Sequence, residues 1–180
     1  SHSQRKLECG MSTLEVKAIQ APSGYDLQMP AGHIVQVVNY QTTAVSTGTT
    51  IIPDDDTIPQ NTEGTEFMTV SITPKKATNN LLIIAEVVFA TSIVNPFGLL
   101  LFRDSTADCL ASNKTYSDKA NEMRTAYVNH FVSAGSTNAT TFKIRCGMPN
   151  AGTVTFNGVG GSRQYGGTLS SSIKVMEVSA

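Results

Sequence analysis

Residues 141–148 read TFKIRCGM, and their alternation decides the fold class. Apolar side chains occupy every second position from Phe142 to Met148, and Lys143 and Arg145 stand between them. Successive side chains of an extended strand point to opposite faces of a sheet, so one face of this segment is apolar and the other is charged. The pattern predicts a β-strand with one face in the core and the other in solvent.

Similar segments follow one another along most of the chain. Residues 66–73 (EFMTVSIT) alternate in the same way, and residues 81–90 (LLIIAEVVFA) form a nearly continuous apolar run, as expected for a strand covered on both faces. Gly, Asn, Pro and Ser separate the segments, and residues 117–124 alone have room for a helical turn or two. About eight strands at this spacing predict an all-β fold, an antiparallel β-sandwich of the jelly-roll type. Further strands are expected in the β-branched run after Gly32 and in residues 97–103, 125–132, 153–157 and 172–178.

The composition argues against two classes of partner. The 180 residues carry a formal net charge of −1, only 15% of them are charged, and no basic run is longer than the pair Lys75 and Lys76. A general nucleic-acid binder needs a basic face, so we expect no nucleic acid as a partner. The longest apolar run, residues 81–85, is far too short to span a bilayer, so we expect no membrane insertion.

The chain divides into three parts. Residues 1–10 (SHSQRKLECG) are polar and patternless, and we interpret them as a cloning remnant or a linker. Residues 11–30 are modest in hydrophobicity, which is typical of an extended connector. Residues 31–180 hold the predicted strands and form one compact domain, a length that suits a single hydrophobic core.

The three cysteines, Cys9, Cys109 and Cys146, are odd in number and widely spaced. This spacing supports neither a zinc ribbon nor a disulfide framework. We interpret the cysteines as reduced thiols, with Cys146 in the core. A cysteine–histidine nucleophile pair with His33 or His130 has no local signature to support it.

Residues 51–64 (IIPDDDTIPQNTEG) concentrate acidic side chains between prolines and a glycine. A calcium ion takes several oxygens from a curved loop, and Asp54, Asp55 and Asp56 are the candidate metal ligands. The spacing does not match an EF-hand, and adjacent side chains on an extended backbone point to opposite sides. We favour a structural turn without a cofactor, in which aspartates accept hydrogen bonds from nearby N–H groups and prolines fix φ. A bound Ca²⁺ is the alternative.

The acidic stretch is also part of a longer signature. Residues 47–83 (TGTTIIPDDDTIPQNTEGTEFMTVSITPKKATNNLLI) resemble a segment of bacteriophage tail-fibre and receptor-binding proteins. In that segment T-x-IP-x-DDT-IPQ-x-x-EG precedes a strand ending in ITP and a loop rich in Ala, Thr and Asn. Residues 19–38 (IQAPSGYDLQMPAGHIVQVV) resemble the join between fibre shaft and terminal domain, and residues 160–178 (GGSRQYGGTLSSSIKVMEV) resemble the closing strand. The resemblance covers residues 14–179.

This resemblance implies a C-terminal tip domain of a tail fibre, located on the virion and joined through residues 11–30 to the fibre shaft upstream. It implies a homotrimeric head that binds a receptor on the host surface, either an outer-membrane receptor or, as we favour, a glycan. Three weak sites on one rigid head gain avidity through effective concentration. The resemblance carries over no defined receptor and no catalytic residue.

Two apolar segments favour a trimer on separate grounds. Residues 81–89 and 97–102 hold more apolar surface than one small sandwich needs for its own core. Exposed apolar surface of that extent normally marks an interface, and closed symmetric assemblies are the usual way to cover it. We therefore expect some of this surface to pack against further copies of the chain.

Receptor contacts are expected on loops at the pole opposite the connector, because that pole is free to meet a cell. Residues 105–124 are longer than an ordinary hairpin connection, and residues 158–167 (GVGGSRQYGG) place an aromatic ring between glycines. Tyrosine offers broad contact area, and arginine and asparagine offer hydrogen bonds. Packing of Tyr165 at the trimer axis is the alternative. The candidate receptor-binding residues are Asn113, Tyr116, Arg163, Gln164 and Tyr165.

Catalysis is not expected. A polysaccharide hydrolase needs a pair of carboxylates, and we favour instead structural ion pairs of the candidate carboxylates with Arg103 or Arg145. The alternatives to an adhesive fibre tip are a capsid decoration or cement protein and a glycan-modifying hydrolase or esterase. The carboxylates weighed for such a hydrolase are Glu86, Asp104, Asp108 and Glu177.

Overall fold

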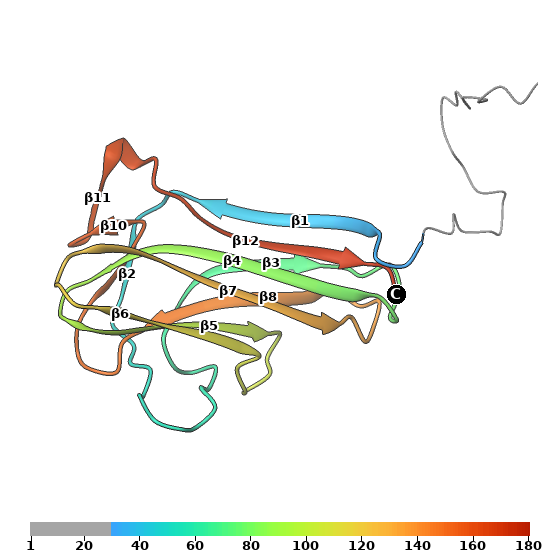
Figure 1. The fold of residues 1–180 in the computed structure, drawn as a ribbon, viewed down its shortest axis with the longest axis horizontal. Helices are drawn as coiled ribbons and strands as arrows, with labels where there is room; N and C mark the ends of the chain where they lie inside the picture. The colour runs from blue at the N-terminus through green and yellow to red at the C-terminus, as the bar shows by residue number, and fades with distance from the viewer. Residues whose placement is uncertain (1–29) are drawn as a thin grey trace, which may run out of the picture.

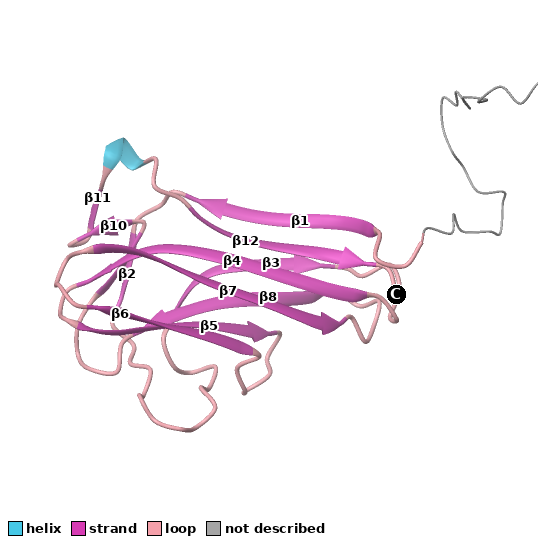
Figure 2. Cartoon of the chain, viewed as in Figure 1, coloured by secondary structure: helices cyan, strands magenta, loops and turns pink. Residues whose placement is uncertain are grey.

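The structure, a computed structural model, describes residues 30–180. The expected segment 1–10 and all but the last residue of the expected connector 11–30 lie outside the described residues. The described chain consists of strands and one short 3₁₀ turn (Figures 1 and 2). The elements are β1 (Ile34–Thr42), β2 (Ser46–Gly48), β3 (Thr65–Ile72), β4 (Asn80–Thr91), β5 (Asn95–Arg103), β6 (Ala111–Ser117), β7 (Met123–Ser133), β8 (Thr140–Gly147), β9 (Val154–Phe156), β10 (Gly158–Val159), β11 (Ser162–Arg163), η1 (Tyr165–Gly167) and β12 (Ser171–Val178).

Two antiparallel sheets pack face to face. In the β4 sheet, β1 pairs with β12, β12 with β4, and β4 with β7. Strand β9 pairs with β4 beyond the end of β12, and β2 pairs with β9. In the β5 sheet the order is β3-β8-β5-β6. Most connections cross from one sheet to the other, as in a jelly roll, so the predicted all-β antiparallel sandwich is confirmed.

The core lies between the two sheets and follows the predicted alternation. In β8 the side chains of Phe142, Ile144 and Cys146 are buried, and those of Lys143 and Arg145 between them are partly exposed. Burial of such side chains contributes roughly 1.5–3 kcal/mol each and is the main force that holds the sheets together.

Strand β4 departs from the expectation of coverage on both faces. Its inward side chains, such as Ile83 and Val87, are fully buried. The alternate side chains, including Leu82, Ile84 and Glu86, point away from the core and are only partly buried. Residues 30–180 therefore cover one face of β4 fully and the other only in part.

Two expectations about residues 105–124 are wrong. Residues 117–124 contain no helical turn, because Ser117 ends β6, residues 118–122 form a bend and a turn, and β7 begins at Met123. Residues 105–124 are also no long loop, since β6 lies within them and pairs with β5 along its whole length. The sequence of β6, ASNKTYS, is polar and lacks apolar alternation, so only its pairing with β5 shows that it is a strand.

Both ends of the described chain meet at one pole of the sandwich. The backbone N–H of Gly32 donates to the Ser179 carbonyl at 2.9 Å, and the N–H of His33 donates to the Ser179 hydroxyl at 3.1 Å. The β10–β11 hairpin and η1 lie at the opposite pole (Figure 1). Within residues 30–180, no helix is long and apolar enough to cross a membrane.

Candidate functional site

The acidic loop, residues 51–64, is anchored on the outer face of the β5 sheet through Ile52, whereas residues 53–58 are exposed. Its Ile52 packs on Leu100 and Phe102, which form a small second cluster of buried side chains. Gly147 makes this close approach possible, because a Cβ there would lie 2.6 Å from the carbonyl oxygen of Thr50. The second apolar face of β5 is therefore covered by the chain itself, so this part of the apolar surface is not left for an interface.

Polar contacts hold the far part of the acidic loop in place. The N–H of Cys109 donates to the Pro59 carbonyl at 2.9 Å, and the Gln60 amide donates to the Asp108 carboxylate at 3.0 Å. The Glu63 carboxylate accepts a hydrogen bond from the Gln60 N–H at 3.2 Å. The IPQ-x-x-EG part of the signature is thus a structural corner that ties the loop to the β5–β6 connection.

The three aspartates have separate contacts. Asp55 accepts hydrogen bonds from the hydroxyl of Thr57 at 2.6 Å and from its N–H at 2.9 Å, the turn contact that the sequence predicts. These bonds, first the side-chain one and then the backbone one, lower the pKa of the Asp55 carboxyl. Asp54 forms an ion pair with Lys114 of β6. In the described part of the chain, no group of three or more His, Cys, Asp or Glu is placed to hold a metal ion.

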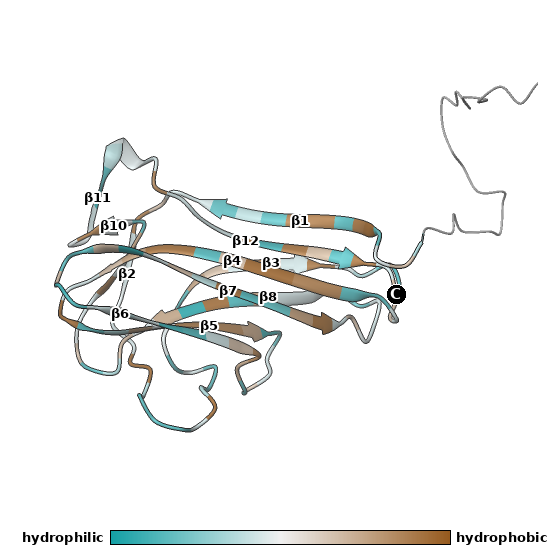
Figure 3. Cartoon of the chain, in the orientation of Figure 1, coloured by the Kyte–Doolittle hydropathy of each residue, from teal (hydrophilic) through white to brown (hydrophobic). Residues whose placement is uncertain are grey.

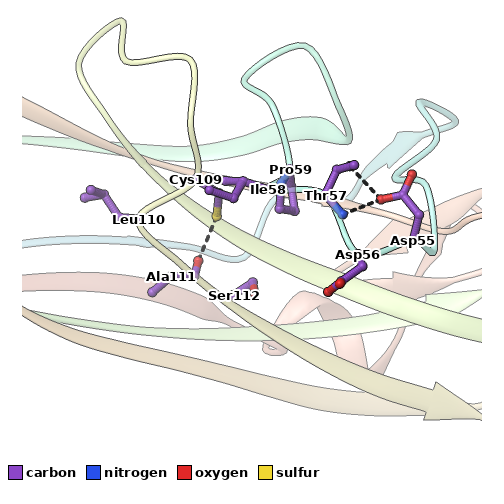
Figure 4. A pocket seen from close by; sticks show the side chains of 9 residues that line it. All are labelled: Asp55, Asp56, Thr57, Ile58, Pro59, Cys109, Leu110, Ala111 and Ser112. Atoms are coloured by element: carbon purple, nitrogen blue, oxygen red, sulfur yellow. Dashed lines mark hydrogen bonds between the residues drawn. The ribbon is translucent and has the colours of Figure 1, made fainter.

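The acidic loop and β6 border two adjoining pockets, which together we name the β6 groove. Figure 4 shows the larger of the two. The larger has a volume of about 340 Å³ and the smaller about 190 Å³. Both are lined by Asp55, Thr57, Pro59 and Ser112. The larger is also lined by Asp56, Ile58, Cys109, Leu110 and Ala111, and the smaller by Ile52, Pro53, Asp54, Pro96, Gly98, Leu100, Asn113, Lys114 and Pro149.

Tyr116 extends this groove along the same face of β6. It alternates with Ser112 and Lys114, so the three side chains point to one side of the strand. It pairs in register with Pro96, which lines the smaller pocket, and 58% of Tyr116 is exposed. An exposed ring beside hydroxyls, a carboxylate and an ammonium group suits a polyhydroxylated ligand. The sequence analysis did not select Ser112 and Lys114 as site residues. Their two-residue spacing from Tyr116 places them on the same face only once β6 is known to be a strand.

The other receptor candidates lie elsewhere or have structural contacts. The amide of Asn113 donates to the Tyr127 carbonyl at 2.7 Å and so joins β6 to β7 of the other sheet. Arg163 ends β11, and Gln164 and Tyr165 follow it at the far pole. Tyr165 is 79% exposed and has a φ of 46°, a value that is uncommon for a residue with a side chain. The five candidates therefore fall in two places, β6 and the segment around η1.

The thiols of the described chain are poorly suited to nucleophilic chemistry. Cys146 lies in the core, and burial raises the pKa of its thiol. Burial also raises the pKa of Cys109, although its S–H contacts the carbonyls of Leu101 and Ala111. Reactive cysteines have a lowered pKa, which is the opposite of what both sites show.

The carboxylates considered for hydrolysis are dispersed. Glu86 faces outward from β4, whereas Glu177 of the neighbouring strand β12 is fully buried on the core side of the same sheet. Asp104 lies 3.7 Å from Arg103 and accepts a hydrogen bond from Thr140, so the expected structural ion pair is confirmed there. It is wrong for Glu177, whose partners are neutral hydrogen-bond donors.

A family model described as the Pgp3 C-terminal domain matches residues 40–180. The chain belongs to this family. The match to the Pgp3 C-terminal domain begins within β1 and runs to the last residue, so it includes the acidic loop, β6 and η1. The description of the family names a C-terminal domain, as does the sequence resemblance. It does not mention phage tail fibres.

Comparison with solved structures found matches to this Pgp3 C-terminal domain. The structure of Eiger TNF from S. frugiperda matches with a TM-score of 0.50 at 11% identity, over 80% of this chain and 94% of that chain. The C-terminal domain of EclA, described as a sugar-binding protein, matches with a TM-score of 0.33 at 15% identity, over 77% of this chain and 85% of that chain. A search of the curated proteins found no match.

Proposed function

We propose that this domain is a homotrimeric adhesion module at the tip of a phage tail fibre and that each copy binds a host-surface glycan in its β6 groove. The proposal rests on one observation, an apolar row across the outer face of the β4 sheet. Pairing aligns Phe131 of β7 with Leu82 of β4, Leu82 with Met176 of β12, and Met176 with Val37 of β1. Phe131 is 55% and Val37 53% exposed.

Coverage by further copies explains this row. Hydrophobic segments of β1, β4 and β7 lie toward the pole where the described chain begins (Figure 3). Exposed apolar surface that is continuous over several strands marks an interface, and cyclic symmetry covers it without leaving an open end. Three copies packed along this face keep the β5 sheet, with its groove, on the outside of the head.

Binding rather than catalysis agrees with the geometry of the groove. Asp54 is paired with Lys114, Asp55 is bonded to Thr57, and the Cys109 thiol has a raised pKa. The groove is open and has both polar and apolar lining residues, which suits weak recognition of a sugar, and three copies on one rigid head raise the overall avidity. The sequence resemblance to tail-fibre tips supports the location on a virion.

Light scattering on the purified chain tests the assembly. We expect the mass of a trimer, and we expect Phe131→Glu to yield a folded monomer because it places a charge in the apolar row. Lys143→Glu, on the outer face of the β5 sheet, is the matched control and should remain a trimer. A parent chain of monomer mass at micromolar concentration would refute the trimer.

Binding to a panel of immobilised bacterial lipopolysaccharides and capsular polysaccharides tests the groove. We expect Tyr116→Ala to remain a trimer and to lose at least about tenfold in affinity, since aromatic anchors carry much of the energy of such contacts. Tyr165→Ala is measured in parallel. Loss of binding only in Tyr165→Ala would move the site to the η1 pole, and dissociation of Tyr165→Ala would assign that ring to the interface.

A further inference from the structure

Two opposite charges lie on the outer face of the β4 sheet, next to the apolar row. Register places Lys174 of β12 opposite Ile84 of β4, and Ser172 opposite Glu86. Lys174 and Glu86 are therefore diagonal neighbours on adjacent strands, and both point away from the core. Both side chains are already partly buried in the single chain.

Within the described residues of one copy, neither charge is neutralised. The Lys174 ammonium donates to the Ser172 hydroxyl at 3.1 Å, a neutral acceptor. Among residues 30–180, no ion pair includes Lys174 or Glu86, and Glu86 has no side-chain hydrogen bond. Because Lys174 turns toward Ser172, the Glu86 carboxylate has no partner among residues 30–180.

Covering this face makes the unpaired charges costly. On this face Ile84 is the neighbour of Lys174 across the strands and of Glu86 along β4. The next outward-facing pair along the two strands is Leu82 and Met176, and Tyr127 of β7 is paired with Glu86. A charge that loses its water in such apolar surroundings requires a partner of opposite sign. The face carries one of each sign, so it is complementary to a second copy of itself.

We propose that Glu86 of one copy pairs with Lys174 of the adjacent copy, so that three such ion pairs form a closed ring in the trimer. This inference rests on the proposed homotrimer. In cyclic symmetry a contact from one side chain to a different one on the next copy is repeated at every interface. The apolar row would then supply affinity, and the ring of charges would fix the register between copies.

Single charge reversals test the pair. We expect Glu86→Lys and Lys174→Glu each to raise the concentration at which the trimer dissociates by about tenfold or more, because each places like charges together. The double reversal, Glu86→Lys with Lys174→Glu, should restore assembly. Lys143→Glu is the control for a charge change outside this face, and circular dichroism verifies that every variant is folded.

Mixing the two single variants separates a pair between copies from a pair within one copy. Chains with Glu86→Lys are positive at both positions, and chains with Lys174→Glu are negative at both. If the pair joins copies, the mixture should form mixed trimers, in which two of the three pairs have opposite signs, at concentrations where each variant alone dissociates.

Each other outcome is decisive. A monomeric parent refutes the trimer itself. A trimeric parent whose single reversals assemble normally, or whose double reversal fails to recover, refutes the pair but leaves the trimer. Recovery in the double reversal without co-assembly of the two single variants places the pair inside one copy and overturns the proposal.

Discussion

Glu177→Gln is the substitution for which the structure makes the sharpest prediction. The Glu177 carboxylate is fully buried and accepts hydrogen bonds from four neutral donors, one of which, the Lys75 N–H, is shared between its two oxygens. The shortest come from the side chains of Asn79 and Gln36, each at 2.6 Å, and the backbone N–H of Lys75 donates at 2.8 Å. The N–H of Lys76 completes the set at 3.2 Å. These contacts tie β12 to β1 and to the β3–β4 connection.

A glutamine cannot reproduce this arrangement. Its amide has one oxygen that accepts and one nitrogen that only donates, so the nitrogen would face donors that have no acceptor. Gln36 could rotate its own amide to accept, but it would then lose its bond to the Thr73 carbonyl at 2.8 Å. Hydrogen bonds to a charged group contribute about 1.5–3 kcal/mol each, and an unsatisfied buried donor costs about 1–3 kcal/mol. We expect Glu177→Gln to lower the free energy of unfolding by about 2–4 kcal/mol.

The effect has a defined pH dependence. Burial, the largest single influence, raises the pKa of the Glu177 carboxyl, but its hydrogen bonds together lower it more, so the folded-state pKa lies below the ordinary value. A carboxyl with a lowered folded pKa stabilises the protein above its unfolded pKa of about 4.3, and this contribution disappears as pH falls through the folded value. The difference between parent and Glu177→Gln should therefore be largest near neutral pH and shrink in acid.

Urea denaturation at one fixed protein concentration, followed by circular dichroism at pH 7 and at pH 4 and below, measures this difference. Glu66→Gln is the control, because Glu66 lies 3.5 Å from Arg145 at a partly exposed position and such surface pairs contribute about 0–1 kcal/mol. If Glu177→Gln matches the parent at pH 7 to within the effect of Glu66→Gln, the buried hydrogen-bonded carboxylate does not stabilise this fold as reasoned.

Three further substitutions examine the acidic loop and β6. Gly147→Ala should cost about 1–3 kcal/mol in chemical denaturation, because its Cβ would overlap the Thr50 carbonyl and lift the loop off the sheet; an unchanged midpoint would show that the loop adjusts freely. Asp55→Ala should lower the melting temperature through loss of both Thr57 bonds, and EDTA should leave the parent's melting temperature unchanged; a large drop with EDTA that Ca²⁺ restores would favour the cation site instead. Asn113→Ala should cost about 0.5–1.5 kcal/mol of stability in chemical denaturation, because it loses the hydrogen bond from its amide to the Tyr127 carbonyl of β7, and an unchanged midpoint would show that this contact does not stabilise the fold.

The class of fold could be predicted from local sequence because alternation is a property of each strand by itself. The pattern of residues 141–148 is reproduced in β8, where Phe142 and Ile144 are buried. The acidic stretch was likewise predicted as a turn, because an aspartate that bonds an N–H two residues later is a local contact. Both predictions depend only on neighbours along the chain.

The tertiary structure alone decided which strands are neighbours and which faces remain open. Strand β6 has no apolar pattern, so its pairing with β5, and with it the position of Tyr116, could not be seen in the sequence. The apolar runs of β4 and β5 look alike, yet Ile52 covers Leu100 on β5 whereas nothing in the described chain fully covers Leu82 on β4. The physical reason is that burial is set by contacts between segments distant in sequence, and a strand's own side chains do not specify what will pack against its second face.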